Sequence, residues 1–84
     1  MKITFSSQAW EEYVSWQHAD AKMIKRINAL IKDISRSPSD GIGKPEPLKY
    51  ALSGFWSRRI NDEQRIVYRM VDGALEIAQV KFHY

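Results

Sequence analysis

The chain of 84 residues contains no cysteine, which excludes a disulfide framework, a zinc site built from thiolates and a cysteine nucleophile. It also lacks long apolar runs: its longest uninterrupted apolar stretches are a few residues, against the ~20 that a membrane-spanning helix needs. Residues 1–5 lack the apolar region of a signal peptide. We therefore expect a soluble, cytoplasmic protein with no membrane contact.

Length and charge restrict the function classes further. Eighty-four residues suffice for one small domain, expected over residues 1–84, and leave no room for a nucleotide-binding sheet plus a substrate lobe. Hydrophobic residues at 44% and charged residues at 27% are typical of a globular fold. Thirteen Lys and Arg against ten Asp and Glu give a net charge of +3, which favours a polyanionic partner without proving one.

The first part of the chain predicts a short strand followed by two helices. Residues 2–5 alternate polar and apolar side chains, and Ser6 or Ser7 is a good helix N-cap. Asp20 is expected to cap a second helix, which Pro38 ends because the residue before proline is pushed out of the α region. The first helix should bury one bulky face, made of Trp10, Tyr13, Val14 and Gln17. The second should bury Met23, Ile24, Ile27, Leu30, Ile31 and Ile34.

The second part of the chain predicts extended structure. Pro45 and Pro47 stand two residues apart and exclude a helix there. Strands are expected over 55–60, 65–71 and 74–84, with a turn at 61–63 and a two-residue hairpin at 72–73. The order predicts an α+β fold in which two N-terminal helices pack on one face of a twisted antiparallel sheet.

Alternation along the strands predicts a cationic face on the sheet. If the helices cover Ile66, Tyr68 and Met70 in one strand and Ala78, Val80 and Phe82 in the last, other side chains project to the opposite face. That open face would gather Arg59, Arg65, Arg69, Lys81 and His83. Away from the turns, no Asp or Glu in the two long strands has the same outward parity, so these cations lack partners within those strands and repel one another. A bound anion would relieve that repulsion. Wet sheet faces are also commonly polar without any ligand, so both explanations stay open.

The titratable residues fit RNA cleavage without a metal better than a metal site. Acidic residues are scattered, and no ligand spacing such as HxxxH is present. Cleavage through the 2′-hydroxyl needs a base, cations for the phosphorane and an acid. Glu46, held between two prolines, and His83 are candidates, although a solvated loop acid and an exposed terminal histidine are equally simple explanations. Tyr84 has the parity of the covered set, so a core or dimer role competes with a catalytic one.

Four segments together resemble a known family. They are Gly43-Lys44-Pro45-Glu46-Pro47-Leu48-Lys49, Leu52-Ser53-Gly54-Phe55-Trp56-Ser57-Arg58-Arg59-Ile60, Arg65-Ile66-Val67-Tyr68 and the terminal His83-Tyr84. The chain resembles the YoeB toxins of bacterial toxin–antitoxin systems, within the RelE/ParE superfamily, over essentially its whole length. The resemblance implies a RelE-like β-α-α-β-β-β(β) fold and a ribosome-dependent mRNA endonuclease, or mRNA interferase, that cuts the codon in the ribosomal A site and stops translation.

The resemblance also implies partners. Family members are homodimers and are neutralised by a YefM-type antitoxin whose acidic, partly disordered segment folds over the toxin. Operator DNA would be bound only through that complex, because the sequence has no helix-turn-helix signature of its own. No metal or other cofactor is implied.

Four catalytic roles follow from the resemblance. Glu46 would be the general base, Arg65 the stabiliser of the phosphorane and His83 the general acid. Tyr84 would orient or stack on the substrate.

The resemblance also implies positions that bind RNA. Lys49 and Arg59 would contact phosphates or ribosomal RNA, and Arg69 and Lys81 would add auxiliary positive charge. Gln64 departs from the family pattern, in which many members have histidine before the arginine.

Other functions remain compatible with the residues. The chain could block the A site without cutting, inhibit DNA gyrase as ParE-type toxins do, or serve mainly as half of a repressor complex.

Overall fold

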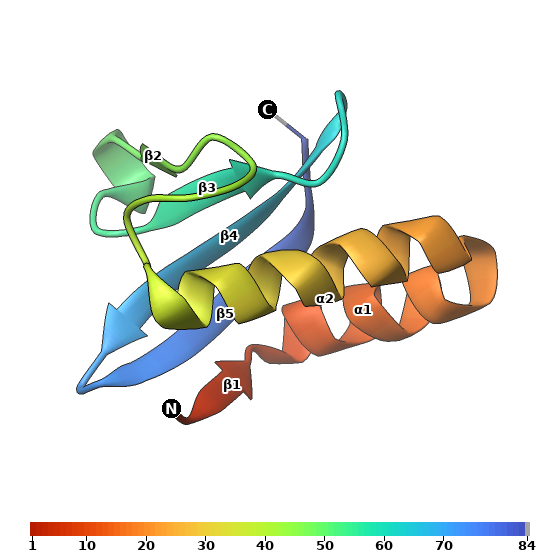
Figure 1. Cartoon of the computed structure of the whole chain (residues 1–84), viewed down its shortest axis with the longest axis horizontal. Coiled ribbons are helices and arrows are strands. Elements are labelled where there is room, and N and C mark those ends of the chain that lie inside the picture. Colours follow the sequence, from red (N-terminus) through yellow and green to blue (C-terminus); the bar gives the residue numbers. More distant parts are fainter. Residues whose placement is uncertain (84) are drawn as a thin grey trace.

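Two helices cover one face of a five-stranded sheet in the computed structural model, which describes residues 1–83 (Figure 1). The strands are β1 (Ile3–Phe5), β2 (Glu46–Pro47), β3 (Trp56–Arg59), β4 (Gln64–Val71) and β5 (Ala74–His83). The helices are α1 (Ser7–Ala19) and α2 (Ala21–Arg36), and a 3-10 turn, η1 (Tyr50–Leu52), follows β2. The expected α+β class is confirmed.

The helices begin and end where local chemistry predicts. The Ser6 hydroxyl accepts a hydrogen bond of 3.0 Å from a backbone N–H three residues on, and so caps α1. The Asp20 carboxylate accepts one of 3.0 Å from the N–H of Lys22, and so caps α2. The second helix ends at Arg36, just ahead of Pro38. Within residues 1–83 no helix has the length and apolar character needed to cross a membrane.

The hydrophobic core lies between the helices and the sheet. α2 contributes four buried side chains, Met23, Ile27, Leu30 and Ile34. They pack against buried residues of the sheet and its turns, namely Ile60, Ile66, Tyr68, Leu75, Ile77 and Val80. Four of the six side chains predicted for the apolar stripe of α2 are thus buried, and the other two, Ile24 and Ile31, are half-buried.

α1 buries a different face from the one predicted. Ala9 is fully buried, and Tyr13 and Trp16 pack against the core. Trp10 is 53% exposed and packs instead on the rings of Phe5 and Tyr13, with centroids 5.7 and 5.9 Å away. The expectation was wrong for Trp10 and for Gln17, which is also exposed, because the packed stripe starts one residue earlier on the helix.

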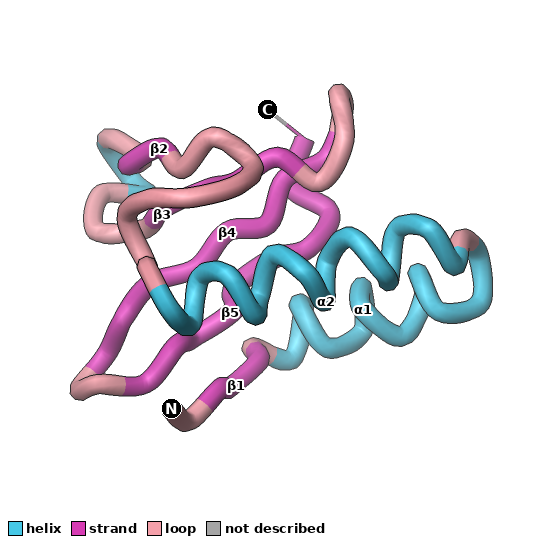
Figure 2. The backbone as a smooth tube through the Cα atoms, in the orientation of Figure 1, coloured by secondary structure: helices cyan, strands magenta, loops and turns pink. Residues whose placement is uncertain are grey.

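The sheet is mixed rather than wholly antiparallel. Its order is β1-β5-β4-β3-β2, and β1 pairs in parallel with β5 whereas all other pairs are antiparallel (Figure 2). Strands β2 to β5 are joined by short links, which favours antiparallel neighbours. β1 is separated from them by both helices, a connection long enough to return the chain in parallel.

The register of β5 shifts along its length, and this changes which side chains face the helices. Val67 pairs with Gln79 but its neighbour Tyr68 pairs with Ile77, so β5 contains an extra residue there. Such a bulge reverses the alternation beyond it. The buried residues of β5 are therefore Leu75, Ile77 and Val80, so the expectation is confirmed for Val80 and wrong for Ala78 and Phe82, which are half-buried. A second shift, between Arg65 and Val67, places Phe82 opposite Arg65. In β4, Met70 was also expected to be covered but is 37% exposed.

Candidate active site on the open face of the sheet

Glu46 and Arg65 meet on the sheet face opposite the helices. Glu46 lies on β2 and Arg65 on β4, with β3 between them. Glu46 Oε2 is 3.6 Å from Arg65 Nη1, and the Arg65 side chain is only 12% exposed while that of Glu46 is 44% exposed. A carboxylate that solvent and substrate can reach thus lies beside a largely enclosed cation.

The segment that carries Glu46 is fixed on both sides. The N–H of Arg59 donates to the carbonyl of Gly43 (2.7 Å), and the N–H of Leu48 donates to the carbonyl of Phe55 (2.9 Å). The flanking prolines limit the backbone further. Glu46 is therefore presented by a restrained strand, and the prediction of extended structure is confirmed at Glu46 and Pro47.

Ser57 orients the guanidinium of Arg65. Its hydroxyl accepts a hydrogen bond of 3.1 Å from Arg65 Nη1, and it pairs with both Glu46 on β2 and Val67 on β4. Ser57 and Val67 are fully buried although they project to the predicted open face. Long side chains can cover neighbouring surface with their stems, and Arg65 lies back across this face toward Ser57.

Arg59 adds a second cation beside Arg65. The two arginines are directly opposed in the β3–β4 ladder, and Arg59 is exposed. Like charges directly opposite one another on a sheet repel. Glu46 offsets part of this repulsion, and a phosphate placed between the arginines would offset more.

A hollow of about 290 Å³ adjoins Glu46 at the edge of the sheet, where β2 leads into η1. It is lined by Glu46, Pro47, Leu48, Lys49, Tyr50 and Leu52. Lys49 is exposed. Tyr50 is 92% exposed, and its backbone is in the left-handed region with φ +57°. The hollow therefore combines a cation and an aromatic ring next to the candidate base.

His83 is the exposed last described residue of β5, near the start of β4. Phe82, not His83, is directly opposite Arg65, and His83 pairs with Gln64. A second shift of register, between Arg65 and Val67, accounts for this difference from the predicted parity. It places His83 on the side of Gln64 and not on that of Arg65, so the prediction that His83 shares the face of Arg65 was wrong. Tyr84, the remaining predicted catalytic residue, lies outside the described residues.

Two predicted members of the cationic face have other partners. Arg69 Nε donates to Glu76 Oε1 (2.8 Å), and its guanidinium carbon lies 4.8 Å from the centroid of Phe55. Lys81 Nζ lies 4.8 Å from the ring centroid of Trp16, on α1. The expectation that the open-face cations have no acidic partner within the two long strands was wrong for Arg69, whereas the acid beside Arg65 comes from β2. Lys81 leans toward α1 instead of joining Arg65.

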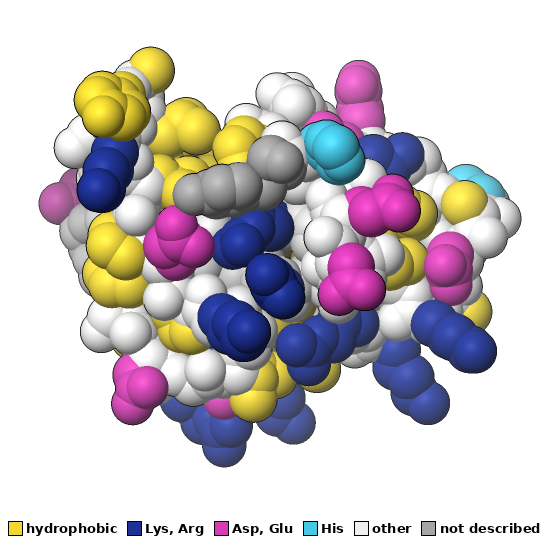
Figure 3. Space-filling view, turned by 90° about the horizontal axis from the view of Figure 1, so that it is seen from above, with side chains coloured by type: hydrophobic (Ala, Val, Ile, Leu, Met, Phe, Trp, Pro, Cys, Tyr) yellow, Lys and Arg dark blue, Asp and Glu magenta, His cyan; other side chains and the backbone are white. Residues whose placement is uncertain are grey.

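Lys and Arg side chains nevertheless gather in the middle of the face seen in Figure 3, with Asp and Glu side chains on both flanks. On the open face of the sheet, Glu46 and Glu76 lie beside Arg65 and Arg69, so this face has mixed charge and is not the purely cationic surface that alternation predicted. Over the described part of the chain, no three Asp, Glu or His side chains are grouped so that they could hold a metal ion.

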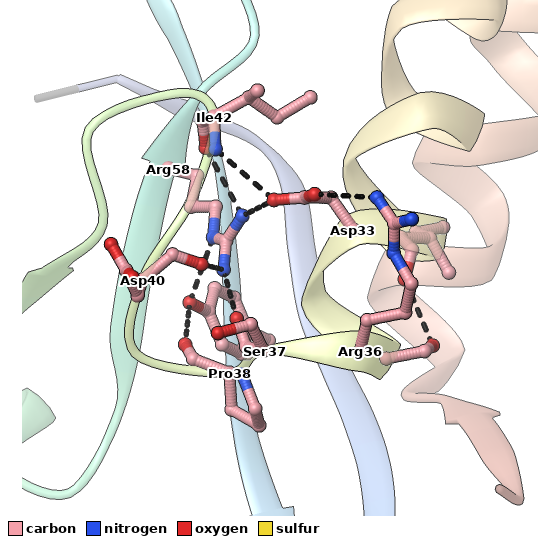
Figure 4. A network of polar contacts seen from close by, with 10 residues as sticks. Asp33, Arg36, Ser37, Pro38, Asp40, Ile42 and Arg58 are labelled. Atoms are coloured by element: carbon pink, nitrogen blue, oxygen red, sulfur yellow. Dashed lines mark hydrogen bonds and ion pairs between the residues drawn. The ribbon is translucent and has the colours of Figure 1, made fainter.

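A fully buried arginine anchors the loop that leads to the candidate site (Figure 4). Arg58 makes five hydrogen bonds: to Asp33 Oδ2 (2.6 Å), the Tyr68 hydroxyl (3.1 Å) and the carbonyls of Ser37, Asp40 and Ile42. Burial raises the pKa of Tyr68, whose hydroxyl donates to the Pro38 carbonyl at 2.6 Å. The loop between α2 and β2 is thus tied to β3 and β4.

Acid should weaken this network. The hydrogen bond from Arg58 is the main reason that the pKa of Asp33 is below its ordinary value of 3.8. Stability from a lowered carboxyl pKa is complete above the unfolded value and is lost as the pH falls through the folded one. We expect the difference in urea midpoint between wild type and Asp33→Asn to be largest at neutral pH and to shrink below pH 3.8. A difference that stays constant down to pH 3 would contradict this assignment.

Sequence reasoning missed both Ser57 and Arg58 as supporting residues. A signal was present for each. Arg58 alternates with the outward Arg59 and so shares the parity of the apolar Trp56 and Ile60, and a buried arginine needs a carboxylate partner. Ser57 shares the outward parity of Arg59 and so was placed to contact an outward side chain of the next strand.

Comparison with known proteins agrees with this architecture. A family described as YoeB-like toxin of bacterial type II toxin-antitoxin system matches residues 5–84. Toxin YoeB of Streptomyces coelicolor is 57% identical over 84 residues, the whole of both chains. A YoeB dimer from Staphylococcus aureus superposes with a TM-score of 0.93 at 52% identity, covering 100% of this chain and 98% of the other. A heterotetrameric YoeB-YefM complex from the same organism gives 0.91 at 52% identity with the same coverage. The chain therefore belongs to the YoeB-like toxins of bacterial type II toxin–antitoxin systems.

Proposed function

We propose that this toxin is an endoribonuclease that cuts mRNA in the ribosomal A site by attack of the 2′-hydroxyl, without a metal ion. The observation that carries the proposal is the approach of Glu46 Oε2 to Arg65 Nη1, 3.6 Å apart, with Arg59 opposite Arg65. A base next to cations is what this reaction requires, because proton removal and the build-up of negative charge on phosphorus occur together.

The proposed reaction needs four side chains. Glu46 takes the proton of the 2′-hydroxyl, whose oxygen then attacks the adjacent phosphorus. Arg65 stabilises the negative oxygens of the phosphorane. The bond to the 5′-oxygen breaks, His83 gives that oxygen a proton, and the product carries a 2′,3′-cyclic phosphate. Tyr84 would orient the substrate.

RNA binding is supported by the surface around Glu46. Arg59 and Lys49 are exposed cations suited to phosphates. Single-stranded RNA is commonly bound by stacking of its bases on aromatic side chains, and the 92% exposed Tyr50 offers such a ring. A message strand running from Arg65 past Glu46 to Tyr50 would contact all of these groups, with the ribosome holding the rest of the message.

We infer the protein partners from relatives. YoeB of Staphylococcus aureus occurs as a dimer and in a heterotetrameric YoeB-YefM complex. At about half identity over the whole chain, the same assemblies are the simplest expectation here: a homodimer and a complex with a YefM-type antitoxin, through which operator DNA would be bound. The net charge of +3 suits an acidic antitoxin segment.

A single 2′-deoxy nucleotide in the message tests the reaction. Placed on the 5′ side of the cut linkage, it should abolish cleavage on translating ribosomes while toxin binding is retained, because the attacking hydroxyl is gone. The same substitution one nucleotide further along should leave cleavage unchanged. Continued cleavage of the first message would exclude 2′-hydroxyl attack. Inhibition of translation without cleavage of the unmodified message would favour a ribosome-blocking toxin, and inhibition of gyrase alone a ParE-like one.

A further inference from the structure

Gln64 has a buried polar atom that no hydrogen bond satisfies. Its side-chain oxygen, Oε1, is the one such side-chain atom among residues 1–83. Buried polar groups nearly always have partners, because an unpaired one loses its bonds to water and gains nothing. An orphaned acceptor at the edge of a candidate site therefore indicates a donor that reaches it in another state of the site.

The backbone of Gln64 is already committed to the turn that precedes β4. Its carbonyl accepts from the N–H groups of Ile60 (2.9 Å) and Asn61 (3.3 Å), and its own N–H donates to Asn61 Oδ1 (2.7 Å). Gln64 is thus held in place, and the main chain cannot move to satisfy Oε1 without breaking these bonds. The missing donor must come from a neighbouring side chain.

Two neighbouring side chains have an N–H donor, Asn61 and His83, and the Asn61 amide already donates to Met23 Sδ (3.5 Å). His83 is therefore the better candidate. It is directly opposite Gln64 in the β4–β5 ladder, and opposed residues project from the same face with Cβ atoms about 4.5–5.5 Å apart. On the other side Gln64 faces Ile60, whose side chain has no donor. The His83 side chain is exposed, so a rotation of its ring is not blocked by packing.

We propose that Gln64 is a positioning residue for His83: its amide oxygen accepts the N–H of one ring nitrogen, which fixes the ring at the end of β5 and leaves the other nitrogen as the one available for proton transfer. The inference rests on the proposed role of His83 as proton donor. An amide oxygen accepts from both the neutral and the cationic imidazole, so it holds the ring before and after proton transfer. Fixing one nitrogen of a histidine selects which nitrogen is available for chemistry.

The orientation can be measured without any cleavage assay. In ¹⁵N-labelled toxin, the ring nitrogens of neutral His83 should report one strongly favoured tautomer. His18, exposed in the last turn of α1, is an internal control that should show the mixture of a free imidazole. Gln64→Met keeps the shape but removes the acceptor, and should return His83 to the His18 mixture. Gln64→Glu keeps an acceptor and should restore the preference.

Activity on translating ribosomes gives a second, separate readout. Gln64→Met should lower kcat about tenfold with little change in KM, and Gln64→Glu should recover most of the loss. If wild-type His83 shows the same tautomer mixture as His18, or if Gln64→Met leaves its mixture unchanged in a folded protein, the positioning role is wrong. If the tautomer responds as expected but no variant or wild type cleaves RNA, the orientation stands and the proposed nuclease function fails.

Discussion

Glu46→Gln is expected to slow message cleavage on translating ribosomes by about 10²- to 10⁴-fold, the usual contribution of a well-placed acid or base. Glutamine keeps the size and the hydrogen-bonding oxygen of the side chain but cannot accept the proton of the 2′-hydroxyl. Arg65 and Ser57 keep their hydrogen bond of 3.1 Å, so ribosome binding should change little. Mapping of message ends after addition of wild type or variant measures the effect.

Glu76→Gln is the matched control for this experiment. Glu76 also belongs to a carboxylate–arginine pair on the sheet, with Oε1 2.8 Å from Arg69 Nε, but it lies far along the ladder from Glu46. The control should cut the message within about twofold of wild type, since partly exposed ion pairs contribute little. If both variants are equally active, Glu46 is not the base. If both are equally impaired, the loss reflects general disturbance of the sheet.

Arg58→Met is expected to destabilise the fold by about 3–5 kcal/mol, the range for breaking a buried charge pair. The substitution keeps a long side chain but leaves the carbonyls of Ser37, Asp40 and Ile42 without their donor. For a domain of this size the melting temperature should fall by at least about 10 °C. Urea unfolding followed by tryptophan fluorescence gives the free energy directly.

Arg59→Met separates this effect from the loss of any positive charge. Arg59 is the next residue on β3 but is exposed, and no ion pair with it is found in residues 1–83. Its replacement should change the free energy of unfolding by less than about 0.5 kcal/mol. Similar melting temperatures for the two variants would show that the Arg58 network does not hold the loop.

Features decided by nearby residues were predictable from the sequence. The cap at Asp20, the end of α2 before Pro38 and the hairpin at Asp72-Gly73 each depend on the conformational preferences of a few neighbouring residues. Both hairpin residues indeed have positive φ, +50° and +77°. The class of fold followed from the order of such local elements.

The candidate site was predictable only in part. The meeting of Glu46 with Arg65 was expected from the family resemblance, and alternation correctly placed Arg59 beside Arg65. Alternation failed in β5, where one shift of register near Ala78 moved the buried positions and a second, between Gln79 and Phe82, set Phe82 opposite Arg65. A bulge depends on what the partner strand and the helices offer, so the residues of the strand alone do not reveal it.

Residue order alone was enough to establish the helices, most of the strands, the absence of thiol chemistry and the family, because each depends on composition or on short segments. Long-range packing set the rest: the parallel pairing of β1, the burial of Arg58 against Asp33, the partners of Arg69 and Lys81, and the unpaired oxygen of Gln64 beside His83. These features depend on contacts between strands or between the sheet and the helices. Such contacts exist only once the chain has folded, because their energies depend on distance and burial rather than on sequence neighbours.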